Sequence, residues 1–151
     1  MLRQTTVLED ISQTGSQMGR LAVEYATDMA PFASMSLPQV QELVRNIPYV
    51  RDPEGEEAVH RPWITLNGYG IGRDCDDKAV CIGAWAVLQG WSFKFLAAGN
   101  GDGKTSPAFC HVFAVLQVPG MGWTWVDATY DYDRIGTHKP YKNQRVIFSR
   151  N

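Results

Sequence analysis

Apolar residues recur at helical spacing in two segments near the N-terminus. The first segment runs from Ser16 to Ala30, and Pro31 ends its pattern. The second begins at Ser36 and Gln39, which fit a capping box, and it ends before Pro48. Each segment carries its apolar residues on one face. The pattern therefore predicts two amphipathic helices that cover a hydrophobic core.

A third segment is apolar on all sides. Ala79 to Leu88 contains no charged or strongly polar side chain, which is typical of a helix buried in the core. Asp74 is a good N-cap, two aspartates follow in the first turn, and Gly90 closes the segment. The sequence thus predicts a buried helix that begins at Cys75.

Two stretches of the chain lack a clear period. For residues 1–13 we expect a strand, an arm or a frayed tail, and we assign no function to them. Pro48 to Gly70 is rich in proline, glycine and acidic residues, and we expect a long surface connection there. Loops of this length in compact domains often carry function. Trp63 and Tyr69 either line the approach to Cys75 or anchor the loop to the core.

After Gly90 the pattern becomes that of strands. Runs of aromatic and β-branched residues predict strands at 91–98, 109–118 and 123–126, with a fourth candidate at 145–148. Glycine-rich stretches at 99–103 and 119–122 predict turns. Helices followed by an antiparallel sheet indicate a single α+β domain over residues 1–151.

Composition and charge narrow the classes of partner. The chain has 14 Lys and Arg against 16 Asp and Glu, and no basic cluster. We therefore expect neither nucleic acid nor an anionic membrane as a partner. No apolar run approaches the ~20 residues of a membrane span, and the N-terminus lacks the apolar segment of a signal peptide. A cytoplasmic protein is expected.

The three cysteines do not suggest a disulfide framework. Cys75 and Cys81 are six residues apart on one predicted helix. Their axial separation is roughly 9 Å, which exceeds the ~7 Å limit for a disulfide. We interpret Cys81 and Cys110 as packing residues, and His60 and His138 as surface residues.

Cys75 has a position suited to thiol chemistry. Backbone N–H groups at a helix start favour a thiolate, but the neighbouring aspartates raise a thiol pKa, so a cationic partner is needed. His111 lies eight residues before Pro119 and Asp127 eight residues after it, so antiparallel pairing of their strands brings them together. A carboxylate could then orient an imidazole that faces Cys75, as in a catalytic triad.

Structural roles for the same residues stay open. A lone cysteine is commonly a small buried apolar residue, and a histidine within a strand is often structural. A metal site built from Cys75, Cys110, His111 and Asp127 lacks the usual ligand spacing. We expect no metal and no cofactor.

Four blocks of the chain, in order, resemble the core of the transglutaminase-like superfamily. The blocks are Gly72-Arg73-Asp74-Cys75-Asp76-Asp77-Lys78-Ala79-Val80, Gly90-Trp91-Ser92-Phe93-Lys94-Phe95, Cys110-His111-Val112-Phe113-Ala114-Val115 and Trp123-Thr124-Trp125-Val126-Asp127-Ala128-Thr129. The resemblance spans residues 70–130. It implies a papain-like α+β core and a triad of Cys75, His111 and Asp127. The usual Asp-Pro-Thr after the last strand is here Asp127-Ala128-Thr129, which keeps the carboxylate.

The resemblance leads to two functional expectations. The first is a cysteine hydrolase, a peptidase or amidase, that forms an acyl-enzyme on a peptide or protein substrate. A groove lined by Trp63, Tyr69 and Trp123 would hold the substrate, and the backbone N–H of Cys75 would stabilise the oxyanion, with Trp63 or Tyr69 as a side-chain donor.

The second expectation rests on the segment 49–62, which resembles the lead-in of small phage and prophage members. It is a virion-associated assembly protein that binds other virion proteins without catalysis.

Overall fold

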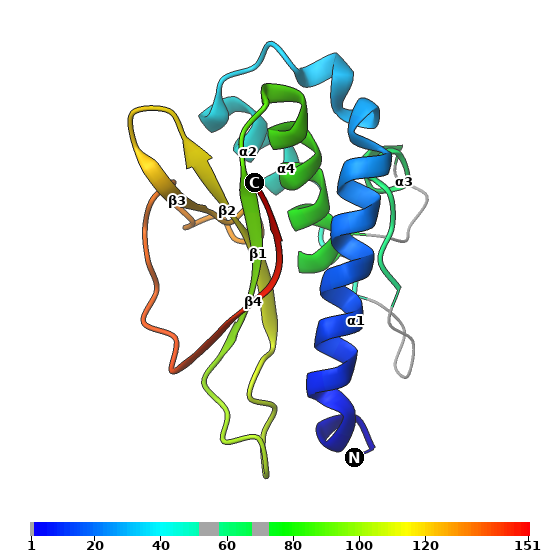
Figure 1. The fold of residues 1–151 in the computed structure, drawn as a ribbon, viewed down its shortest axis with the longest axis vertical. Helices are drawn as coiled ribbons and strands as arrows, with labels where there is room; N and C mark the ends of the chain where they lie inside the picture. Colours follow the sequence, from blue (N-terminus) through cyan, green and yellow to red (C-terminus); the bar gives the residue numbers. More distant parts are fainter. Residues whose placement is uncertain (1, 52–57, 68–72) are drawn as a thin grey trace.

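The computed structural model describes residues 2–51, 58–67 and 73–151 of the chain. The helices among them are α1 (Leu2–Glu24), the 3₁₀ helix η1 (Ala26–Phe32), α2 (Leu37–Arg45), α3 (Pro62–Asn67) and α4 (Cys75–Gln89). The strands are β1 (Phe93–Gly99), β2 (His111–Val118), β3 (Gly122–Val126) and β4 (Asn143–Arg150). They form one antiparallel sheet in the order β3-β2-β1-β4. The expected α+β class, with helices packed on an antiparallel sheet, is confirmed (Figure 1).

The predicted central helix, α4, has the expected ends. Asp74 accepts a hydrogen bond from the N–H of Asp77, and the Asp77 carboxylate accepts one from the N–H of Asp74, so the two residues form a reciprocal capping box. Gly90 ends the helix with a φ of 75°, a conformation that glycine adopts without steric cost. The buried residues of α4 run from Asp77 to Ala86. Because Asp74 is the N-cap, Cys75 is the first residue of the helix.

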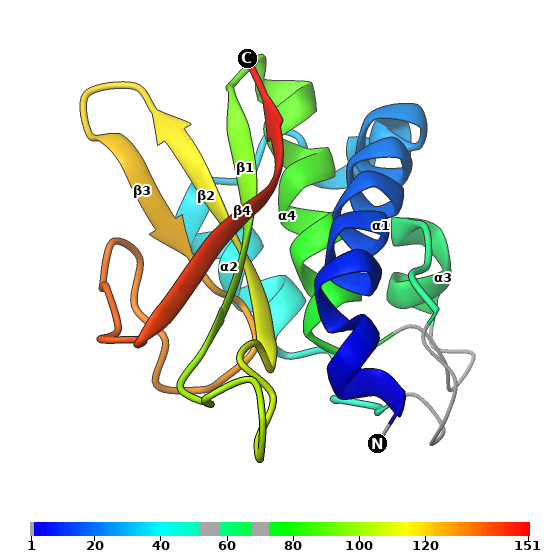
Figure 2. The same ribbon diagram turned by 60° about the horizontal axis from the view of Figure 1, so that its bottom comes forward.

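The two faces of the sheet pack against different parts of the chain. On the inner face, side chains of β1 and β2 such as Phe95 and Ala114 join the main core with α4, α1 and α2. Figure 2 shows α4 and α1 on this side of the sheet, with α3 beyond them. The outer face carries a smaller cluster that includes Phe113 and Trp125. The connection from β3 to β4 covers this cluster, because His138 stacks on Trp125 and Tyr141 stacks on Phe113.

The N-terminal helix differs from the sequence prediction. Residues 2–13, expected as a strand, arm or tail, form the first half of α1. The predicted helix 16–30 is divided, because Tyr25 leaves helical geometry (φ −113°, ψ 26°) and η1 follows. Two glycines explain how α1 packs. A Cβ on Gly15 would lie 2.2 Å from the carbonyl oxygen of Ile147, and one on Gly19 would lie 2.1 Å from the Phe148 ring.

Replacing Gly15 by alanine is expected to destabilise the protein by about 1–2 kcal/mol. Alanine favours a helix over glycine by about 1 kcal/mol, but the added methyl group would meet the backbone of β4, which cannot move aside as a side chain can. Chemical unfolding should show the loss. The exposed neighbour Ser16, changed to alanine, serves as the control and should leave the unfolding midpoint unchanged or slightly raised. Equal midpoints for the two variants would contradict the close packing of α1 on β4.

The connection from 48 to 70 is not a loop throughout. It contains α3, which an ion pair between Arg61 and Asp28 joins to η1, with Nη2 2.8 Å from Oδ1. Residues 52–57 and 68–72 lie outside the described residues. Over the described part of the chain, no helix is both long and apolar enough to cross a membrane.

Candidate active site

His111 and Asp127 meet at the end of the β2–β3 pair. The two strands are antiparallel neighbours, as predicted, and Nε2 of His111 lies 2.5 Å from Oδ2 of Asp127. Both side chains are buried. The register pairs Ala114 with Val126. The next residue, Asp127, therefore lies opposite Phe113, two residues away from His111. This two-residue offset keeps both side chains on one face, because side chains alternate with a period of two along a strand.

Several donors hold the Asp127 carboxylate in its charged form. Its Oδ1 accepts a hydrogen bond of 3.0 Å from the N–H of Thr129, and Nζ of Lys139 lies 3.7 Å from Oδ2. Burial alone would raise the pKa of Asp127, but these groups and His111 lower it overall. From α2, Gln41 donates a hydrogen bond of 2.9 Å to the backbone carbonyl of Asp127. The carboxylate is therefore fixed, charged and bonded to the imidazole.

Cys75 reaches the same end of β2 from the start of α4. Its thiol donates to Oδ1 of Asp76 at 3.5 Å, and it accepts a hydrogen bond from the backbone N–H of Val112, the residue after His111. Burial raises the pKa of the Cys75 thiol, and the charges of Asp76 and Asp74 raise it further. The hydrogen bond from the Val112 N–H lowers the pKa of this thiol, but by less than the other influences raise it. The neutral thiol is therefore the favoured form at rest.

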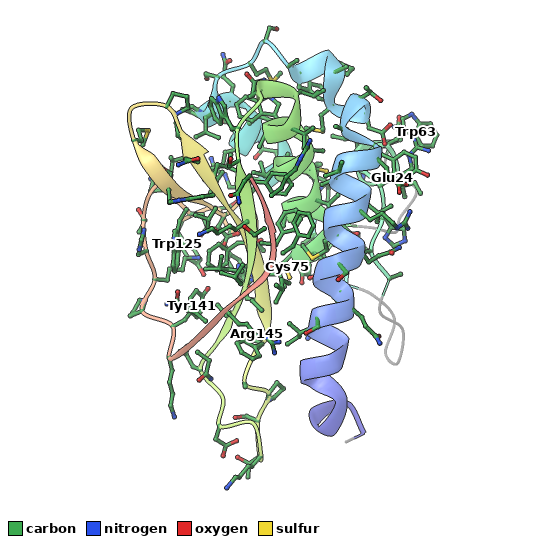
Figure 3. All side chains as sticks on the ribbon, viewed as in Figure 1. Glu24, Trp63, Cys75, Trp125, Tyr141 and Arg145 are labelled. Atoms are coloured by element: carbon green, nitrogen blue, oxygen red, sulfur yellow. The ribbon has the colours of Figure 1, made fainter. Side chains whose placement is uncertain are left out.

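The imidazole and the thiol lie toward opposite faces of the sheet. His111 stacks on Phe113 on the outer face, with ring centroids 5.8 Å apart, whereas Val112 faces the inner core. Figure 3 shows Cys75 at the end of α4 that is turned toward the sheet. The sequence analysis expected the imidazole to face the buried helix directly. In the structure the imidazole lies with the outer-face cluster instead, and the group of β2 that contacts the thiol is the backbone N–H of the next residue, Val112.

Two tyrosines that sequence reasoning missed border this site. The Tyr130 ring lies 5.4 Å from the His111 ring, and the charge of Cys75 contributes to the raised pKa of Tyr130, after burial. Tyr49 is half exposed, and burial followed by the charges of Cys75 and Asp74 raises its pKa. Tyr130 follows the Asp127-Ala128-Thr129 motif closely, which is a signal the sequence offered. Tyr49 offered none.

The aromatic residues expected to line a groove lie elsewhere or outside the described residues. Trp63 is on α3, its backbone N–H donates to Asp28, and Figure 3 shows it beyond α1, well separated from Cys75. Trp123 is at the far end of β3, four residues and about 13 Å from Asp127, under the ammonium of Lys94. Tyr69 lies outside the described residues. The structure thus brings Tyr49 and Tyr130, and not the two tryptophans, to the thiol.

The other two cysteines and His138 differ in their exposure to solvent. Cys81 is buried, as expected for a packing residue, whereas Cys110 is exposed and the packing interpretation was wrong for it. His138 is exposed and stacks on Trp125. Within the described ranges, no group of three or more His, Cys, Asp or Glu side chains is arranged to hold a metal ion.

His60, expected as a surface residue, instead supports the start of α4. The backbone N–H of His60 donates to Oδ1 of the buried Asp77 at 2.8 Å, and its ring Nδ1 lies 3.2 Å from the same oxygen. Burial raises the pKa of Asp77 to about 7. A single carboxylate thus joins the helix cap to the connection that precedes it.

Comparisons of this chain with protein-family models, curated proteins and solved structures gave no match. The chemistry of the site therefore has to follow from its own geometry.

Proposed function

We propose that this protein is a cysteine hydrolase, a peptidase or amidase, with Cys75 as nucleophile, His111 as general base and acid, and Asp127 as the group that orients the imidazole. One observation carries the proposal. Nε2 of His111 is bonded to Asp127, which leaves Nδ1 to act as the base, and the backbone N–H of the next residue, Val112, contacts the Cys75 thiol. An ordered nucleophile, base and carboxylate are what acyl transfer through a thiol requires.

The reaction would begin with a neutral thiol. Because burial and two aspartates disfavour the thiolate, Nδ1 of His111 takes the proton as the sulfur attacks the substrate carbonyl. The backbone N–H of Cys75, at the positive end of α4, stabilises the developing oxyanion. The imidazolium then protonates the leaving amine, and water, deprotonated by His111, releases the acyl group. Throughout, Asp127 keeps the Nε2 proton in place and stabilises the imidazolium.

The substrate class follows from the surroundings of the thiol. Tyr49 and Tyr130 are 50% and 40% exposed, so each presents aromatic surface to solvent beside the nucleophile. Aromatic walls suit an extended peptide, whose backbone supplies the scissile amide and whose side chains contact the rings. In this proposal the domain is a transglutaminase-like, papain-like core, and these tyrosines replace Trp63 and Trp123 as the substrate walls.

One observation favours the second candidate, a non-catalytic assembly protein of a phage particle. The raised pKa of Cys75 is also what an unreactive structural thiol would show. In that case the fold would contribute contacts with other virion proteins, and the His111–Asp127 bond would only stabilise the end of the sheet.

Trapping the acyl-enzyme separates the two candidates. The protein is incubated with an activated peptide ester and its mass is measured, and the acylated residue is identified by peptide mapping. A single acyl group on Cys75, absent from Cys75→Ala and retained in Cys81→Ala and Cys110→Ala, supports the hydrolase. Failure to acylate Cys75, in a protein whose circular dichroism matches a folded α+β domain, would support the assembly protein.

A further inference from the structure

A lysine outside the triad lies against its carboxylate. Nζ of Lys139 is 3.7 Å from Oδ2 of Asp127, which is the oxygen that meets Nε2 of His111. The same ammonium pairs with the carboxylate of Asp133. It also lies over two aromatic rings, 5.0 Å from the centroid of Tyr130 and 4.7 Å from that of Tyr132. Four groups therefore fix the position of one cation.

Asp133 is itself held from two directions. Its side chain is 1% exposed, and its Oδ2 accepts a hydrogen bond of 2.8 Å from the N–H of Tyr130. Arg45 of α2 donates to its backbone carbonyl at 3.0 Å. The Tyr130 and Tyr132 rings are parallel within 3°, with centroids 5.3 Å apart. The position of Lys139 therefore depends on the body of the fold and not on a freely moving side chain.

The position has an electrostatic consequence for His111. A carboxylate that accepts a short hydrogen bond stabilises a protonated imidazole, and a cation beside that carboxylate weakens this effect. Asp133 in turn offsets part of the charge of Lys139. We propose that Lys139 and Asp133 form a pair of positioning residues that set how firmly the His111–Asp127 dyad holds its proton, so that the imidazole both accepts the thiol proton and releases it to the leaving group.

Other charged and titratable groups face the dyad and contribute a constant background. From α4 these are Cys75 and Lys78, whose buried ammonium donates to the Arg45 carbonyl at 3.1 Å and interacts with Asp127. From the connection to β4 they are Tyr130 and Tyr141, whose rings lie 5.4 and 6.2 Å from the His111 ring. Lys139→Met and Asp133→Asn leave the other groups in place, and the Cys75→Ala background of the test below is common to every protein that it compares.

The test measures the His111 pKa directly by NMR titration of the histidine ring signals. It uses a Cys75→Ala background, so that it does not depend on thiol chemistry, and His111→Gln assigns the signal among the three histidines. In Lys139→Met the pKa of His111 should rise by about one unit, because Asp127 acts without the opposing cation. In Asp133→Asn it should fall, because Lys139 acts without its counter-charge. The double variant replaces a neutral pair by a neutral pair, so its pKa should return close to that of the parent.

Opposite shifts from the two variants cannot come from a loss of packing alone. Lys104→Met, on the loop between β1 and β2, is the control for removal of a lysine charge and should leave the His111 pKa unchanged. Shifts of the same sign in Lys139→Met and Asp133→Asn, or no shift in either, would overturn the inference. The catalytic meaning of the inference rests on the proposed function, which is tested separately by acyl-enzyme trapping in the Cys75-containing protein. Correct shifts without acylation would refute the hydrolase and leave the electrostatic pair standing.

Discussion

Replacing His111 by alanine is expected to slow the alkylation of Cys75 at pH 7 by about 10²-fold or more, because general-base assistance typically contributes ~10²–10⁴-fold. The thiol that remains is partly buried and lies beside Asp74 and Asp76, and all three influences raise its pKa. A thiol with even an ordinary pKa near 8.5 is only about 3% ionised at pH 7, and one with a higher pKa is less ionised. Without a base to take the proton, the sulfur is a poor nucleophile.

The pH dependence identifies the base. In the wild-type protein the alkylation rate should rise through the range in which an imidazole loses its proton, because neutral His111 is the acceptor. In His111→Ala that step should vanish, and the rate should rise only at alkaline pH, where the thiol ionises by itself. Iodoacetamide kinetics between pH 5 and 10, with adduct formation followed by mass spectrometry, measure both curves.

Two controls isolate the effect. Cys81 and the exposed Cys110 are changed to alanine in every protein, so that only Cys75 is alkylated. His138→Ala removes the exposed histidine that stacks on Trp125 and should not alter the curve. If His111→Ala reacts at the wild-type rate across the whole range, His111 is not the base, and the arrangement at the end of β2 is structural.

The protein should lose about 3 kcal/mol of folding stability between pH 5 and pH 8 through one carboxyl group, Asp77. Burial raises the pKa of Asp77 from 3.8 to about 7 in the folded state. The folded state therefore holds this proton to a higher pH than the unfolded state does. Its contribution to stability is complete below about pH 4, and it is lost as the pH rises through about 7. The direction is the reverse of that for a salt-bridged aspartate.

Asp127 does not contribute to the change in stability between pH 5 and pH 8. Its pKa is lowered in the folded state, so its contribution is present above the unfolded pKa and stays constant from pH 5 to pH 8. Urea unfolding at intervals of half a pH unit gives the free energy of unfolding directly. Asp77→Asn keeps the size of the side chain and an oxygen that accepts the His60 N–H, and it should flatten the curve.

Asp131→Asn, an exposed carboxyl exchanged in the same way, is the matched control and should keep the slope of the wild-type protein. A wild-type stability that increases from pH 5 to pH 8, or an Asp77→Asn curve parallel to wild type, would show that Asp77 is ionised throughout. The start of α4 would then be held by a charged cap.

Some parts of the fold follow from local sequence and were predicted on that ground. The N-cap Asp74, the apolar run that follows and the glycine at position 90 define α4 without reference to the rest of the chain. The tight hairpin between β2 and β3 brings His111 to Asp127, because antiparallel neighbours joined by a short turn have little choice of partner. The strand prediction erred by a register offset of two residues, which preserved the face.

Other parts of the fold depend on contacts between segments that are distant in the sequence. Local sequence patterns do not predict these contacts. Glycines at 15 and 19 argue against a helix by propensity, yet they lie in α1 because the helix packs closely on β4. The tryptophans at 63 and 123 were expected to line a groove because of their residue type alone, but α3 and β3, which carry them, lie on opposite sides of the molecule (Figure 1). The placement of α3 and the division of α1 from η1 have the same origin.

The sequence by itself determined the buried helix, its first residue Cys75 and the meeting of His111 with Asp127, because caps, periodicity and hairpin length act between residues close in the chain. Only the tertiary structure decided that the thiol meets Val112, that Tyr49 and Tyr130 border it, and that Lys139 stands against Asp127. Burial and charge at a site are sums over side chains contributed by every element that packs there. They exist only once the chain is folded, and with them the protonation states on which the chemistry depends.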